Sequence, residues 1–210
     1  MTLGCSAAGF MRRFCHMQTE IEAKFTDIDV EKIRQLLRET GAIRIHPERL
    51  MRRKNFEWPN HEQAWVRVRD EGDKVTMAYK RCEDRTLHGT KEVEITIDDF
   101  DRGCELLEAV GVHAANLQET KRERWEFNGC EVTIDTWPWV PSFLEVEGPT
   151  EEMVRDTAAK LACEWDKAMH GSVETVYQQH YEVTEDEINA WETITFIPVP
   201  EWLEKKRKHV

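Results

Sequence analysis

Charged and apolar residues alternate along several short segments of this chain, and that two-residue period is typical of half-buried β-strands. Over residues 19–27, Glu20, Glu22 and Lys24 share one face, and apolar side chains share the other. The segment 42–46 fits the pattern less well and is left open. The alternation predicts further strands at about 49–57, 64–70, 74–81, 90–97, 118–127, 131–136 and 142–148.

Turn and capping residues separate these strands from segments with helical spacing of their apolar residues. Glu71-Gly72-Asp73 is a turn signal, and Asn128-Gly129 is the strongest two-residue hairpin signal. The predicted helices cover about 30–40 after the capping residue Asp29, 99–110 before Gly111, and 150–162 after Thr150, with further helices starting near Ser172 and behind the capping box of Thr184 and Glu187.

These elements predict an α+β protein built as an eight-stranded antiparallel β tunnel or barrel with helices packed outside. In an ordinary soluble barrel the charged strand faces would point to solvent. Here the helices need an apolar surface, and the aliphatic strand faces supply it, so the charged faces are expected inside a water-filled tunnel. Because unpaired buried charge is costly, such an interior needs cross-strand ion pairs and bound ligands.

Two sets of charged side chains are expected to line the tunnel. The cations are Lys24, Arg67, Arg69, Lys80, Arg122 and Arg124, and the carboxylates are Glu20, Glu22, Glu92, Glu94, Asp135, Glu145 and Glu147. Carboxylates without histidine or cysteine at metal spacing favour Mg²⁺ or Mn²⁺ over zinc. Arginines bind phosphate oxygens in a bidentate fork. A divalent metal with a highly charged phosphate is the simplest ligand that satisfies both sets.

Composition sets the remaining limits. The formal net charge of −12 argues against nucleic acid or a membrane surface as a partner, and no apolar run approaches the ~18 residues of a membrane span. The six cysteines form no CxxC pair, which is typical of reduced thiols in a cytoplasmic protein. The length of 210 residues favours one domain over about 18–182, with 1–17 as a disordered extension and 183–210 as a helical, basic tail.

The segment Glu20-Ile21-Glu22-Ala23-Lys24 resembles the ExExK signature of the CYTH superfamily, the triphosphate tunnel metalloenzymes. The resemblance departs from the family's second-strand pattern over Leu50 to Glu57. It implies an eight-stranded tunnel that binds Mg²⁺ or Mn²⁺ and a small-molecule triphosphate, such as tripolyphosphate, thiamine triphosphate or a nucleoside triphosphate. After this departure the resemblance to the family continues, in family order, through Arg67-Val68-Arg69, Lys80, Glu92-Val93-Glu94, Arg122-Glu123-Arg124, Asp135 and Glu145-Val146-Glu147.

The resemblance also implies roles for these residues. The seven carboxylates would form the metal side, and the six cations would bind the substrate phosphates, with Lys24, Arg67 and Arg69 in catalytic roles. Lys24 would contact the terminal phosphate or position the attacking water, and a lowered pKa would make it a base. A plain salt bridge to Glu22 is the alternative for Lys24.

Three functions are compatible with such a site. The first is hydrolysis of the terminal phosphate of inorganic or organic triphosphates. The second is a class IV adenylyl cyclase, which would use the same metal and triphosphate contacts but attack the α-phosphate with the ribose 3′-hydroxyl. The third is a non-catalytic module that binds polyphosphate or nucleotides. A homodimer is left open as a further partner.

Overall fold

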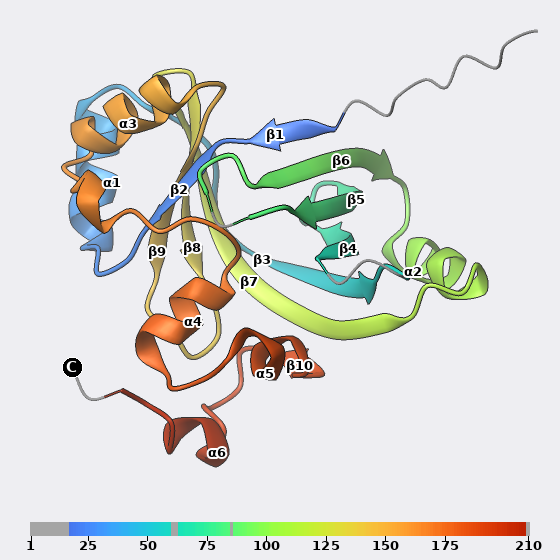
Figure 1. The fold of residues 1–210 in the computed structure, drawn as a ribbon. Helices are drawn as coiled ribbons and strands as arrows, with labels where there is room; N and C mark the ends of the chain where they lie inside the picture. The colour runs from blue at the N-terminus through green and yellow to red at the C-terminus, as the bar shows by residue number, and fades with distance from the viewer. Residues whose placement is uncertain (1–16, 60–62, 85, 209–210) are drawn as a thin grey trace, which may run out of the picture.

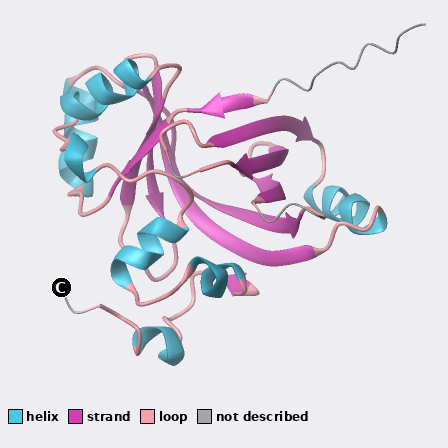
Figure 2. Ribbon diagram, in the orientation of Figure 1, coloured by secondary structure: helices cyan, strands magenta, loops and turns pink. Residues whose placement is uncertain are grey.

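The computed structural model describes residues 17–59, 63–84 and 86–208, so the predicted disordered extension lies outside the described residues except for Met17. Strands of one 10-stranded sheet wrap around a central space, and the helices lie outside that sheet (Figures 1 and 2). The strands are β1 (Gln18–Glu20), β2 (Glu22–Phe25), β3 (Ile43–Glu57), β4 (Ala64–Asp70), β5 (Val75–Cys82), β6 (Thr90–Ile97), β7 (Ala114–Phe127), β8 (Cys130–Thr136), β9 (Phe143–Glu147) and β10 (Thr193–Ile194).

The strand order β1-β6-β5-β4-β3-β7-β8-β9-β2 nearly closes the sheet into a barrel, as the alternation predicts. The predicted strand over 19–27 is divided at Ile21. Its first half, β1, pairs antiparallel with β6, and its second half, β2, pairs antiparallel with β9. Counted as one strand, β1 and β2 therefore join the two ends of an eight-stranded ring, and β10 adds a short parallel pairing to β7.

The segments predicted around 42–46 and 49–57 form one long strand, β3, instead of two. Its pairing with β7 shifts register between Arg44 and His46 and again between His46 and Arg49. Such bulges add residues to one strand and interrupt simple alternation. This is the physical reason why the first part of β3 fits a two-residue period poorly.

The predicted helices are present, with their ends within a few residues of the expected positions. Asp29, Asp99 and Thr150 each accept a hydrogen bond from the backbone of the first helical turn. Thr184 and Glu187 form the expected capping box. The helices are α1 (Val30–Glu39), α2 (Phe100–Ala109), α3 (Glu151–Lys160), α4 (Glu174–His180), α5 (Glu185–Asn189) and α6 (Glu201–Glu204), with a 3₁₀ turn at Trp165–Lys167.

The aliphatic strand faces pack against these helices and so turn the opposite faces inward. Helices α1 and α3 cover β2, β8 and β9 through residues such as Leu37 and Val146, while α2 covers β4 and β5 through Val66 and Val68. The outer face of β6 is different, because Ile95 is 56% exposed and the half-buried Val93 belongs to none of these cores. The packing of aliphatic strand faces on helices, which the alternation predicts for every strand, is therefore not seen at Val93.

The C-terminal segment is docked on the rest of the chain. The backbone amide of Glu182 donates to Lys206, and that of Lys208 donates to the carbonyl of His180. The Lys206 side chain also pairs with Glu187 on α5. The basic run near the end of the chain is thus held against α4 and α5. Within the described residues, no helix has the length and apolar character needed to cross a membrane.

Leu37→Ala is expected to lower the free energy of unfolding by about 3 kcal/mol without changing the charged interior. Leu37 is fully buried between α1 and the sheet, so its truncation removes apolar contacts and leaves a cavity. Chemical denaturation would measure the loss, with Leu106→Ala, an exposed leucine on α2, as the matched control. Equal stability of Leu37→Ala and wild type would contradict this packing.

Candidate active site: a charged tunnel

All six cations and all seven carboxylates predicted for the interior line a single cavity of about 1470 Å³. The alternation of charged and apolar residues therefore identified the inward faces of seven strands correctly, with β1 and β2 counted as one. For the adjacent cations Lys121 and Arg122, only the alternation with Arg124 indicates which of the two side chains points inward. Arg122 points into the cavity, whereas the Lys121 ammonium lies 4.9 Å from the ring centre of Phe196, outside it.

One side of the cavity is acidic and is built by the two halves of the closing strand and by β9. Lys24 Nζ lies 2.5 Å from Glu22 Oε1 and 3.1 Å from Glu145 Oε2, so one lysine bridges two carboxylates. Lys80 Nζ lies 2.9 Å from Glu20 Oε1, and the second carboxylate oxygen of Glu20 is buried without a hydrogen-bond partner. Glu147 has no cation within ion-pair distance in the described part of the chain.

The carboxylates on the acidic side differ in pKa, because each has a different balance of burial and neighbouring charges. Burial, together with the negative charges of Glu20, Glu22 and Glu145, raises the pKa of Glu147 to about 8. Burial also raises the pKa of Glu22, and Lys24 only partly offsets that effect. Burial acts in the same direction on Glu145, but Lys24 and Arg122 outweigh it and lower the pKa of Glu145 to about 2. Glu147 is thus the carboxylate whose charge is least compensated.

Lys24 stays protonated in this arrangement. Burial alone would lower the pKa of Lys24, but Glu145 and Glu22 outweigh burial, and the net pKa lies above its ordinary value. A lowered pKa was the condition for a proton-accepting role, and that condition is not met. The double salt bridge instead makes Lys24 a fixed positive charge at the acidic side.

The opposite side of the cavity is cationic, with side chains from β3, β4 and β7. Arg67 contacts Glu92 and Glu94 at 3.2 and 3.1 Å. Arg69 pairs with Glu71, which is not among the predicted interior carboxylates, and lies 3.7 Å from Glu94.

Arg122 and Arg124 differ in how deeply they enter the tunnel. Arg122 forms a two-pronged contact with Asp135, with Nε 2.6 Å from Oδ1, and also contacts Glu145. The Arg124 side chain is 36% exposed and pairs with Glu131. Arg122 is therefore held inside the cavity, and Arg124 lies toward its edge.

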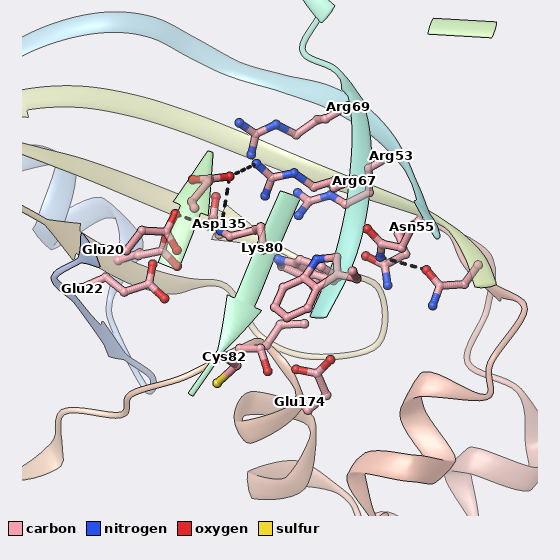
Figure 3. A pocket seen from close by; sticks show the side chains of 18 of the residues that line it. Glu20, Glu22, Arg53, Asn55, Arg67, Arg69, Lys80, Cys82, Asp135 and Glu174 are labelled. Carbon is pink, nitrogen blue, oxygen red and sulfur yellow. Dashed lines mark hydrogen bonds and ion pairs between the residues drawn. The ribbon is translucent and has the colours of Figure 1, made fainter. Parts of the chain in front are cut away.

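Arg53 is the most consequential cavity residue outside the charged strand faces predicted from sequence. It lies on β3 opposite Arg69 in the strand register and is 7% exposed. Figure 3 shows its guanidinium among those of Arg67 and Arg69, on the side facing Glu20 and Glu22. We call Arg53, Arg67, Arg69 and Arg122 the arginine cluster. The signal that could have found Arg53 is its place between Met51 and Asn55 on one strand face.

The far end of the cavity is lined by neutral and acidic groups that were also missed. The Asn55 amide donates to Asn116 Oδ1 at 2.9 Å, and Trp65 lies beside them on β4. Glu174, at the start of α4, is directed toward the same space (Figure 3), and burial raises its pKa. No strand periodicity could have revealed Glu174, because it comes from a helix that covers the tunnel.

The carboxylates fit a divalent cation in donor type, although they do not form a ready-made ligand group. In the described residues, no three acidic, histidine or cysteine side chains are grouped closely enough to hold a metal ion. Lys24 and Lys80 occupy the positions between them. Two observations still favour a cation there: the unpartnered oxygen of Glu20 and the uncompensated charge of Glu147. The four candidates for holding the ion are Glu20, Glu22, Glu145 and Glu147.

Known structures share this architecture. The PH1012 protein of Pyrococcus horikoshii matches with a TM-score of 0.64 at 21% identity, covering 75% of this chain and 98% of that one. A protein of Vibrio parahaemolyticus described as a putative adenylate cyclase matches with a TM-score of 0.66 at 12% identity, covering 78% and 99%. A Hippeastrum protein, "Putative adenylyl cyclase HpAC1", is described as revealing a dominant triphosphatase activity. It matches with a TM-score of 0.52 at 14% identity, covering 78% and 96%.

At these identities the structural matches show a common fold. A comparison with curated protein sequences finds no match. The model of one family, the CYTH domain, matches residues 18–181, which include every strand of the ring and every predicted interior charge. The chain belongs to the CYTH family.

Proposed function

We propose that this protein is a metal-dependent triphosphatase that hydrolyses the terminal phosphate of a small triphosphate inside the tunnel. One observation carries the proposal. A cavity of about 1470 Å³ places the arginine cluster opposite an acidic side on which Glu147 has no cationic partner among the described residues. A polyphosphate together with a divalent cation is the ligand whose charges match both sides.

The arginine cluster would bind and orient the phosphate groups. Arg67, Arg69 and Arg122 already contact interior carboxylates, and these carboxylates hold their guanidinium groups in place before substrate arrives. Fixed donors of this kind stabilise negative charge that develops in the transition state without reorganising. Arg67 and Arg69 are the candidates for that catalytic role.

The acidic side would hold the metal and orient the attacking water. A bound Mg²⁺ or Mn²⁺ would supply Lewis-acid polarisation of the phosphoryl oxygens. Lys24, which stays protonated between Glu22 and Glu145, would donate a hydrogen bond to the terminal phosphate. The remaining interior carboxylates, Glu92, Glu94 and Asp135, position the arginines and lie close enough to the cavity to contact a second ion.

The same contacts would serve an adenylyl cyclase, and product analysis separates the two reactions. The purified protein would be incubated with Mg²⁺ or Mn²⁺ and with tripolyphosphate, thiamine triphosphate or ATP, and phosphate, pyrophosphate and cyclic AMP would be measured. Release of phosphate is expected. Formation of cyclic AMP and pyrophosphate from ATP, with tripolyphosphate left intact, would contradict the hydrolase proposal and support the adenylyl cyclase instead. Binding without any product would leave only the non-catalytic module.

Removal of divalent metal is expected to abolish hydrolysis, and Glu20→Gln is expected to raise the Mg²⁺ concentration needed for half-maximal activity. The amide removes one negative oxygen donor from the acidic side but keeps the size of the side chain. Glu105→Gln, on the exposed face of α2, is the matched control. An unchanged Mg²⁺ requirement in Glu20→Gln would show that Glu20 has only the structural role of pairing with Lys80.

A further inference from the structure

Arg53 differs from the other arginines of the cluster because no carboxylate neutralises it. Each of Arg67, Arg69 and Arg122 has at least one acidic partner within 4.0 Å. Arg53 has none among the residues that the structure describes, although it is 7% exposed and lines the same cavity. A buried guanidinium without a counter-charge is unusual and calls for a physical explanation.

The partners that Arg53 does have are neutral and hold it in position. Its Nη2 donates to Thr120 Oγ1 at 2.8 Å, and its guanidinium carbon lies 4.8 Å from the ring centre of Trp137. Its Nε is buried and has no hydrogen-bond partner. Thr120 and Trp137 therefore fix the guanidinium, while its charge has no partner of opposite sign among the described residues.

The surroundings of Arg53 make the lack of a counter-charge more costly. Burial, and then the positive charges of Arg69, Arg67 and Arg122, lower its pKa well below the ordinary value, although guanidinium groups keep their proton in proteins. Four guanidinium groups thus share one region of the tunnel, and Arg53 is the member of the cluster without a carboxylate within ion-pair distance among the described residues. A polyanion is the ligand that would relieve this repulsion, and a planar guanidinium matches phosphate oxygens in a bidentate fork.

We propose that Arg53 binds a phosphate group of the substrate directly, so that the substrate supplies the counter-charge that the folded protein lacks at this position. This inference rests on the proposed function, because it assumes that the tunnel takes a triphosphate. It adds a binding residue that the sequence resemblance did not include, in the one segment that departs from the family pattern. When a phosphate binds to Arg67, Arg69 or Arg122, part of the binding free energy is lost in weakening an existing salt bridge. Arg53 has no such salt bridge to weaken, so its full charge contributes to the affinity for the anion.

The test measures anion binding and stability without any turnover. Tripolyphosphate would be titrated into the metal-free protein by calorimetry, and melting temperatures would be recorded with and without tripolyphosphate. Arg53→Met is expected to weaken tripolyphosphate binding about ten- to a hundredfold, as for loss of a charged hydrogen bond. Without the anion its melting temperature should equal or exceed that of wild type, because a repelled charge has been replaced by an apolar side chain of similar length.

Arg52→Met is the matched control, since Arg52 immediately precedes Arg53 on β3, points outward and lies over Phe100 on α2. It should bind tripolyphosphate as wild type does. If Arg53→Met does not fold, Arg53→Lys carries the test, because it keeps the charge but loses the fork and should bind severalfold more weakly than wild type. The proposal is overturned if Arg53→Met, or Arg53→Lys in its place, binds tripolyphosphate with unchanged affinity.

Failure of this inference can be distinguished from failure of the proposed function. If wild type binds and hydrolyses tripolyphosphate and the Arg53 variants do the same, Arg53 is a packing residue and the triphosphatase proposal stands. If wild type binds neither tripolyphosphate nor the organic triphosphates, both proposals are wrong. A lower melting temperature of Arg53→Met without anion, together with wild-type affinity, would assign its role to the contacts with Thr120 and Trp137.

Discussion

Arg122→Ala is expected to lower the free energy of unfolding by about 3–5 kcal/mol and to remove most of the triphosphatase activity. Arg122 makes a two-pronged contact with Asp135, whose side chain is 2% exposed. Removal of the arginine would leave that carboxylate buried without its main counter-charge. The activity would fall because the same guanidinium belongs to the arginine cluster. Denaturant unfolding and phosphate release would measure the two effects separately.

The double variant Arg122→Leu with Asp135→Leu is the control for this prediction. Replacing both members of a buried ion pair by apolar side chains is often neutral or stabilising. The double variant should therefore recover much of the stability lost in Arg122→Ala but none of the activity. Stability equal to wild type in Arg122→Ala alone would show that solvent or another cation neutralises Asp135.

The second large effect is a pH dependence of stability that comes from Glu147. Its pKa of about 8 in the folded protein lies above the ordinary carboxyl value, so the folded state holds a proton that the unfolded state has already released. Stability is then lost as pH rises from about 4.5 to about 8, and the upper limit is on the order of 5 kcal/mol for this group. Unfolding of the metal-free protein at several pH values would measure the slope.

Glu147→Gln should flatten this slope, because the amide does not titrate. Saturating Mg²⁺ should flatten it in wild type as well, since a bound cation offsets the repulsion from Glu20, Glu22 and Glu145 that raises the pKa. The same slope for Glu147→Gln and metal-free wild type would mean that another group causes the dependence. A slope unaffected by Mg²⁺ would argue against metal binding beside Glu147.

Strand and helix positions could be predicted from sequence because they depend on local signals. Three examples are the two-residue alternation in β4 and β5, the Asn128-Gly129 turn and the capping residue Thr150. Each of these signals involves only residues that lie a few positions apart in the sequence. The division of the first strand at Ile21 could not be predicted in this way. It depends on which distant strands pair with each half, and neither β6 nor β9 leaves a signal within residues 18–25.

The interior charges were predictable for the same reason, but their pairing was not. Parity along a strand says which side chains point inward. It does not say that Lys24 bridges two carboxylates, or that Glu147 and Arg53 have no partner of opposite charge among the described residues. Those facts follow from the cross-strand register. Alternation does not reveal Arg53, because the register shifts between Arg44 and Arg49 separate it from the preceding pattern.

Closure of the ring by β1 and β2 has a consequence for how the chain reaches its folded state. In the strand register Glu22 lies opposite Glu147, and Glu20 lies opposite Thr90. The first strand can therefore complete its backbone pairing only with strands that lie far along the chain. Contacts of such high sequence separation form slowly. Until they form, β6 and β9 are open sheet edges, which can pair with other molecules and aggregate. Charged side chains that point inward at an edge discourage that pairing. The carboxylates of β6 that hold the arginines, and those of β9 that we assign to the metal side, would thus also protect the nascent protein before the tunnel exists.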